Sequence, residues 1–99
     1  MIGLLVESLS DQDKYQRFAT ARALRDVVSR QPQLIAALIA RLSDKYGFIR
    51  AAAAEALERI GPPAAPALPE LQARLTDYDP MVREAAAAAI ASVTQSDRR

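Results

Sequence analysis

The 99-residue sequence contains no cysteine, no histidine and no tryptophan. Without cysteine the chain forms neither disulfides nor thiolate nucleophiles, which suits a reducing compartment, so we expect a cytoplasmic protein. Without histidine it lacks the side chain that most often transfers protons and binds metals near neutral pH. Its three glycines form no phosphate-binding loop. We therefore expect no catalytic residues, no cofactor and no metal site, and a protein that is not an enzyme.

Neither sign of charge dominates the sequence, and it has no long hydrophobic run. Lysine and arginine number 13 and aspartate and glutamate number 12, which gives a net charge of +1. The basic residues are interleaved with acidic ones and form no continuous stripe, so nucleic acid is not expected as a partner. The apolar segment at the start is interrupted at Glu7. It is far shorter than the roughly 20 residues that cross a membrane, so no membrane association is expected.

What the sequence does contain is alanine in runs, within a pattern that repeats. Four consecutive alanines occur at 51–54 and five at 85–89. Shifting the chain against itself by about 33 residues superimposes aspartate, arginine and alanine positions three times over, as in repeat architectures. The matching sets include Asp11, Asp44 and Asp77; Arg17, Arg50 and Arg83; Ala19, Ala52 and Ala85; Ala21, Ala54 and Ala87; and Ala23, Ala56 and Ala89. We therefore interpret residues 1–99 as one domain of three units, approximately 1–33 (unit one), 34–66 (unit two) and 67–99 (unit three).

Each unit is predicted to contain two α-helices joined by a short polar turn. In unit two, apolar residues between 35 and 42 recur at the i, i+3, i+4, i+7 spacing of a helix with one apolar side. The second helix, 49–60, has a wider apolar side made largely of alanine, whose short side chain lets neighbouring helices approach closely. Gly61 is expected to end this helix. In unit three, Asp79 is expected to cap the second helix, with Pro80 at its first position.

Unit three carries the clearest resemblance to a known family. It rests on Pro69, Asp77, Val82, Arg83, Ala86 to Ala89 and Ile90. This arrangement resembles the HEAT repeat, an antiparallel helix pair that stacks into a solenoid, and the resemblance extends over the whole chain. It implies an all-α fold, an α-solenoid of three HEAT-like helix pairs. It also implies that Pro69 bends the first helix of unit three, where Gly3 and Ala36 stand in the other units.

The resemblance further implies a ladder of hydrogen bonds between neighbouring units. In the family this ladder is made by an aspartate and an arginine six residues apart, and Asp44 with Arg50 match that spacing in unit two. The corresponding residues of units one and three match it as well. Arg50 is therefore expected to be structural and to contact Asp44 or the neighbouring turns.

The predicted function is a non-catalytic protein–protein interaction module, a scaffold or adaptor that binds a protein or peptide. In a HEAT-like stack the second helices line the concave surface, where the family usually binds its partners. The expected contact residues are those that differ between units at solvent-facing positions: Phe18, Arg22 and Arg25 in unit one, and Glu55 and Glu58 in unit two. A second possibility is that the two glutamates pair with the two arginines, which occupy the same repeat positions, and leave this face neutral.

A further candidate surface is a row of aromatic residues near the turns between paired helices. Three of these aromatic residues are predicted partner contacts: Tyr15, Tyr46 and Tyr78. Aromatic residues are enriched at interface hot spots, so this row either binds a partner or seals the ends of the alanine core. Sealing is favoured. Tyr46 is expected to be the most exposed, because it replaces the capping aspartates of the other units.

Another interpretation of the whole chain is a self-assembling structural unit, or a fragment of a longer HEAT-like array. Solenoids need polar caps at their ends, because a terminal repeat has one unstacked face. The first predicted helix begins with Ile2, Leu4 and Leu5, and the last consists mostly of alanine, so neither end resembles such a cap. This interpretation predicts a homo-oligomer formed through the terminal repeats. A nucleic-acid-binding module ranks below both.

Overall fold

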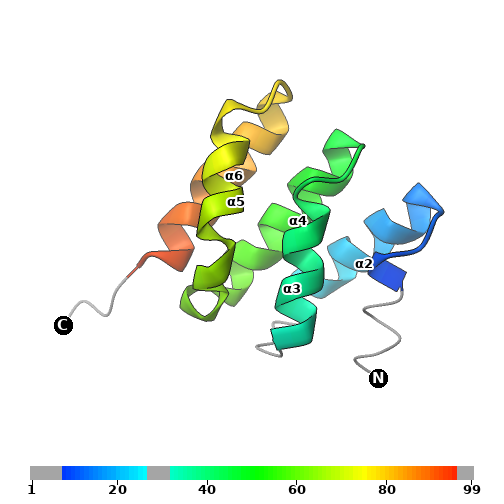
Figure 1. Ribbon diagram of the computed structural model, residues 1–99, viewed down its shortest axis with the longest axis horizontal. Helices are drawn as coiled ribbons and strands as arrows, with labels where there is room; N and C mark the ends of the chain where they lie inside the picture. Colours follow the sequence, from blue (N-terminus) through cyan, green and yellow to red (C-terminus); the bar gives the residue numbers. More distant parts are fainter. Residues whose placement is uncertain (1–7, 27–31, 96–99) are drawn as a thin grey trace.

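The computed structural model describes residues 8–26 and 32–95, and within these ranges the chain is all-α, as predicted, with no strand. The elements are α2 (Lys14–Asp26), α3 (Pro32–Arg41), α4 (Gly47–Ile60), the 3-10 helix η1 (Pro62–Ala67), α5 (Leu68–Ala73), the 3-10 helix η2 (Arg74–Thr76) and α6 (Pro80–Val93). Figure 1 shows two layers, with α3 and α5 in front of α4 and α6. None of the helices in the described part of the chain combines the length and hydrophobicity that a membrane crossing needs.

The helix ends follow the local chemistry of the sequence. Asp79 caps α6, because its side chain accepts a hydrogen bond from the main-chain N–H of Met81, and Pro80 occupies the first turn. Gly61 ends α4 with a φ of 78°, a conformation that glycine adopts without a steric penalty. Both predictions are confirmed.

The helical segment that leads into unit three is broken, whereas α3 is continuous. The 3-10 helix η1 contains three prolines, and Ala64 within it has non-helical dihedral angles. Proline supplies no N–H for a helical hydrogen bond, so this segment cannot form a regular α-helix. The short helix α5 starts at Leu68 with Pro69 in its first turn, where the missing N–H costs nothing. The bend therefore extends over several prolines and does not lie at Pro69 alone.

Alanine allows α4 to pack against a second helix on each side. Helix α4 contacts both α2 and α6 as well as α3. Its alanines 51–54 and Ala56 are all buried, together with Leu57 and Ile60. A helix that is buried around most of its circumference needs short side chains wherever another backbone approaches. The repeated alanine is thus a packing requirement of the solenoid.

Buried arginine–aspartate pairs, which we call the ladder, join each second helix to the next unit. Arg17 Nε donates to Asp44 Oδ2 at 2.7 Å. Arg50 donates to Asp77 through Nε and Nη2, both at 2.9 Å. Each arginine also donates from Nη1 to the main-chain oxygen of the aspartate in its own unit, at 2.7 Å. The predicted ladder is confirmed, and the carboxylate that Arg50 binds belongs to the following unit.

A second arginine completes each rung, and sequence reasoning missed it. Arg41 donates to Asp44 and Arg74 to Asp77, each from Nη1 at 3.1 Å. These two arginines lie three residues before their aspartates, at equivalent repeat positions, so the repeat itself contained the signal. In unit one the equivalent residue is Ser8.

The ladder sets the ionisation of both buried aspartates. The hydrogen bond from Arg50 lowers the pKa of Asp77 more than burial raises it, and the main-chain N–H of Asp79 adds to the lowering. For Asp44, burial is the largest single influence and raises the pKa. The hydrogen bonds from Arg17 and from the main chain of Tyr46, together with the positive charges of Arg17 and Arg41, outweigh it, so the net pKa is lowered. Both carboxylates are therefore charged at neutral pH.

We expect Arg50→Ala to lower the free energy of unfolding by about 3 kcal/mol or more, because it leaves the carboxylate of Asp77 buried without its main partner. Arg83→Ala is the matched control. Among the described residues, Arg83 makes the same main-chain hydrogen bond, to Asp77 at 2.7 Å, but binds no carboxylate. Its loss should cost only about 1 kcal/mol. Urea unfolding in dilute solution measures both values, and equal losses would contradict the structural role of the ladder.

Stability should also depend on pH through the ladder. Because the pKa of Asp77 is lower in the folded protein than its ordinary value of 3.8, the pair stabilises the fold above that pH. This contribution is lost as the pH falls through the lower, folded value. The difference in unfolding free energy between wild type and Asp77→Asn should therefore shrink below about pH 4. Glu84→Gln, at an exposed position of α6, is the control. A difference that does not change with pH for Asp77→Asn would refute the assignment.

Candidate functional site

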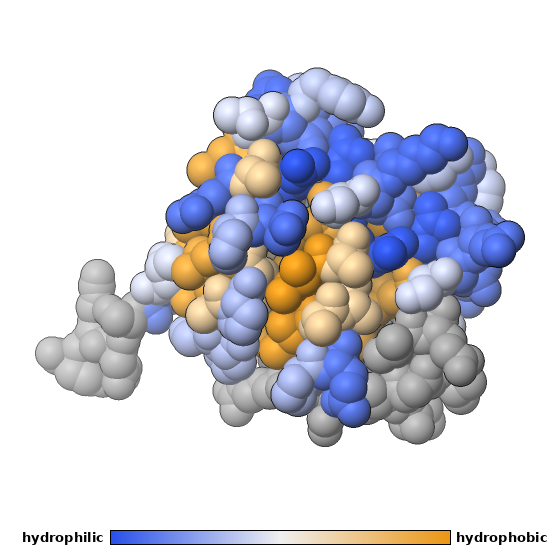
Figure 2. Space-filling model, viewed as in Figure 1, coloured by the Kyte–Doolittle hydropathy of each residue, from blue (hydrophilic) through white to orange (hydrophobic). Residues whose placement is uncertain are grey.

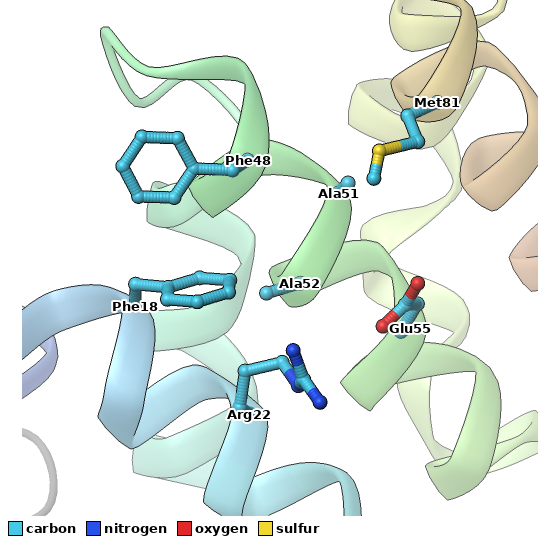
Figure 3. A pocket seen from close by; sticks show the side chains of 7 residues that line it. All are labelled: Phe18, Arg22, Phe48, Ala51, Ala52, Glu55 and Met81. Carbon is cyan, nitrogen blue, oxygen red and sulfur yellow. The ribbon is translucent and has the colours of Figure 1, made fainter. Parts of the chain in front are cut away.

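A small pocket is lined by side chains from α2, α4 and α6 (Figure 3). Its volume is about 80 Å³, and its lining residues are Phe18, Arg22, Phe48, Ala51, Ala52, Glu55 and Met81. All three units therefore contribute to it through their second helices.

The aromatic wall of the pocket joins units one and two. Phe18 lies in the second turn of α2, and Phe48 lies in the first turn of α4. Their ring centroids are 5.0 Å apart at an interplanar angle of 86°, the edge-to-face arrangement that aromatic pairs favour. Both residues are half-buried, so part of each remains exposed to solvent.

The floor of the pocket is formed by alanines, whose small side chains leave space above them. Ala51 and Ala52 are buried at 3% and 2% exposure, and their methyl groups end where a larger side chain would fill the space. Ala51 occupies the same repeat position as Phe18 in unit one. Unit one therefore presents a large ring at this position, and unit two leaves room beside it.

Two oppositely charged side chains lie at one end of the pocket. The guanidinium carbon of Arg22 lies 5.5 Å from the centroid of the Phe18 ring, within the range of a cation–π interaction. Figure 3 shows the guanidinium extending from α2 toward α4, and Glu55 projecting from α4 beside the pocket. Arg22 is exposed and Glu55 is half-buried. The pocket thus combines an apolar wall and floor with charge of both signs.

The structure brings together only part of the residue set predicted from the sequence. Phe18, Arg22 and Glu55 line the pocket together. Glu58, half-buried on α4, is not among the lining residues. Arg25 lies in α2, but its side chain falls outside the described part of the structure.

The three tyrosines lie near the starts of the second helices and do not line the pocket. Lys14 Nζ lies 4.5 Å from the ring centroid of Tyr46 and 5.3 Å from that of Tyr15. Tyr78 instead lies beside the ladder, with the guanidinium carbon of Arg50 5.4 Å from its ring centroid.

The prediction that Tyr46 is the most exposed of the three is wrong. Tyr46 is half-buried, whereas Tyr15 and Tyr78 are 67% and 82% exposed. The Tyr46 ring packs against Phe48, with centroids 5.8 Å apart, and beneath Lys14. Its side chain does not cap α4, so it is free to fold over its neighbours.

Sequence reasoning missed Met81, which forms the edge of the pocket on the unit-three side. Met81 is 57% exposed, and its side chain points toward Ala51 (Figure 3). It occupies the same repeat position as Tyr15 and Phe48. Comparing that position across the three units shows a large apolar side chain each time, and this was the available signal.

A second, more apolar depression lies on the opposite layer. It measures about 240 Å³ and is lined by Pro32, Ile35, Ala36, Ile39, Pro63 and Pro66. These residues come from α3 and η1. Figure 2 shows apolar surface gathered in the middle of this face.

The size and chemistry of the pocket between the second helices limit what it can hold. Pockets that bind small molecules and cofactors measure roughly 300–1,000 Å³, several times its volume of about 80 Å³. A space of this size fits one apolar side chain of a protein partner. Arg22 presents a planar set of donors that suits a carboxylate next to that side chain.

The sequence matches a family model of known proteins. The family model described as HEAT repeats matches residues 2–91. A search of curated proteins found no match to the chain.

We expect the Phe18–Phe48 contact to couple α2 to α4 energetically. In a double-mutant cycle of Phe18→Ala and Phe48→Ala, the interaction energy should be about 0.5–1.5 kcal/mol, as for other edge-to-face pairs. Phe18→Ala combined with Tyr78→Ala is the control, because the Tyr78 ring packs on Arg50 instead. That pair should be additive. An additive Phe18–Phe48 cycle, measured by urea unfolding, would show that the ring contact does not join the helices.

Proposed function

Because the chain belongs to the HEAT-repeat family, we propose that it is a non-catalytic protein-interaction module that binds a partner on the face of α2, α4 and α6. HEAT repeats commonly serve as protein-interaction scaffolds. The absence of histidine and cysteine from the sequence agrees with a role that needs no proton transfer or nucleophile.

The observation that carries this proposal is the pocket beside the Phe18–Phe48 pair. Two half-buried aromatic rings beside an alanine floor form a small apolar recess with charged side chains at one end. Binding hot spots combine such recesses with aromatic and arginine side chains, and a partner residue that enters one is removed from water on all sides. We infer that the partner inserts one apolar side chain beside the two rings, over the alanine floor.

The charges beside the recess define the rest of the partner segment. The Arg22 guanidinium already packs over the Phe18 ring. It therefore loses less conformational entropy when it binds a carboxylate. The best-matched partner is therefore an amphipathic segment with one apolar anchor and an acidic group on the α2 side.

The test uses the partner captured from a lysate of the source organism, with affinities then measured by titration calorimetry. Phe18→Ala should weaken binding about 30-fold, equivalent to about 2 kcal/mol, because it removes one wall of the recess. Arg22→Glu should weaken it by a similar factor. Arg59→Glu, at an exposed position of α4 outside the pocket, is the charge-matched control and should leave the affinity unchanged.

Unchanged affinity in Phe18→Ala and in Arg22→Glu would overturn the assignment of this surface. Ile39→Glu distinguishes the other candidate, because Ile39 lines the depression between α3 and η1. Binding that is lost only in this variant would place the partner on the opposite layer.

A further inference from the structure

We propose that the two ends of the molecule bind each other, so that unit three of one copy stacks on unit one of a second copy, head to tail. The inference rests on the repeat. Equivalent residues in the three units are buried or exposed according to whether a neighbouring unit lies on their side, so burial identifies which residues form each interface.

One set of positions faces the following unit. Ala21 and Ala54 are fully buried, but their equivalent Ala87 is exposed. Leu42 is likewise fully buried, whereas its equivalent Leu75 is 41% exposed. In unit three these positions still carry the small and apolar residues of an internal interface, although no unit among the described residues covers them.

A second set of positions faces the preceding unit. These positions are buried in units two and three but exposed in unit one. Ala56 and Ala89 are fully buried, but their equivalent Ala23 is exposed. Ala52 and Ala85 are buried and Ala19 is exposed in the same way. Unit one therefore presents the alanines that units two and three use to receive a neighbour.

Among residues 8–26 and 32–95, the ladder has one unfilled position at each end. Arg17 and Arg50 each bind the aspartate of the following unit, whereas Arg83 is exposed with no described carboxylate to bind. Arg83 Nη1 nevertheless donates to the main-chain oxygen of Asp77 at 2.7 Å, the same bond and the same length as in the two filled rungs. Its guanidinium therefore already makes one of the main-chain hydrogen bonds found in the filled rungs.

The complementary half of the missing rung lies in unit one. Asp11 is exposed and occupies the same repeat position as Asp44 and Asp77. Those two aspartates accept hydrogen bonds from the ladder arginine of the preceding unit. A copy placed before unit one would bring its own Arg83 to Asp11. The charges also select the orientation, because two unit-three ends facing each other would bring two Arg83 side chains together. Such a head-to-tail contact joins different surfaces of the two copies and so extends into chains or rings.

The test blocks one end at a time. Ala87→Glu places a charge on the unit-three end, and Ala23→Glu places one on the unit-one end. At concentrations of about 1 mM, where contacts of about 4 kcal/mol become populated, the wild type should sediment with an average mass above the 10.8 kDa of one chain. Each variant alone should remain at the mass of one chain. Circular dichroism confirms that both are folded.

Mixing the two variants gives the decisive result. Ala23→Glu retains a free unit-three end and Ala87→Glu a free unit-one end, so the equimolar mixture should form a dimer of twice the single-chain mass and nothing larger. Ala88→Glu is the matched control. Ala88 is exposed and lies next to Ala87. Its equivalents Arg22 and Glu55 line the pocket and do not belong to either set of interface positions. The Ala88→Glu variant should therefore associate as the wild type does.

Three results would overturn the proposal. These are a wild type that stays at the mass of one chain, a mixture of Ala23→Glu and Ala87→Glu that stays there, and a loss of association in Ala88→Glu equal to that in Ala87→Glu. A dimer formed between two unit-three ends would also be recognised, because Ala23→Glu alone would still form it.

Discussion

The hydrogen-bonded pair of an arginine in one unit and an aspartate in the next is the interaction on which the rest of the structure depends. Burying both charges is costly unless their hydrogen-bonding capacity is used. Asp77 meets that condition by accepting from Arg50, from Arg74 and from the main-chain N–H of Asp79. The planar guanidinium binds in one orientation only, so the pair fixes how far each second helix is displaced from the next. The position of the pocket between α2 and α4 follows from that displacement.

Alanine supplies the other constraint, because it sets the distance between the helices that the ladder aligns. Close packing around α4 leaves little room for large side chains in the middle of the second helices. Phe48 and Met81 accordingly lie in the first turns, and Phe18 only one turn further along. The pocket arises at this boundary, where large rings next to buried alanines leave a gap. The same choice of residue that makes the stack compact therefore also creates the recess on its surface.

The parts of the fold that local chemistry controls could be predicted from the sequence, and the parts that depend on stacking could not. Asp79 and Gly61 act within a few residues of themselves, so their capping roles follow from residue type and position. Arg50 was expected in a ladder, but the aspartate that it reaches depends on the offset between units. Tyr46 was misjudged because the residues that cover it belong to the packed structure. Comparison of equivalent positions identified Phe18, Arg22 and Glu55 as site residues but overlooked Met81. The offset between neighbouring units brings the Met81 side chain to the pocket.

The central place of α4 has a consequence for how the molecule opens. In repeat proteins, stability is close to a sum over units and the contacts between neighbours, so a unit at the end detaches by breaking one interface and a central unit only by breaking two. Helix α4 contacts α2 on one side and α6 on the other, and each of these interfaces includes a rung of the ladder. Local unfolding should therefore begin at the outer helices and reach α4 last. The amide protons of α4 are then the slowest to exchange with solvent, at a rate that reports the opening of the whole domain.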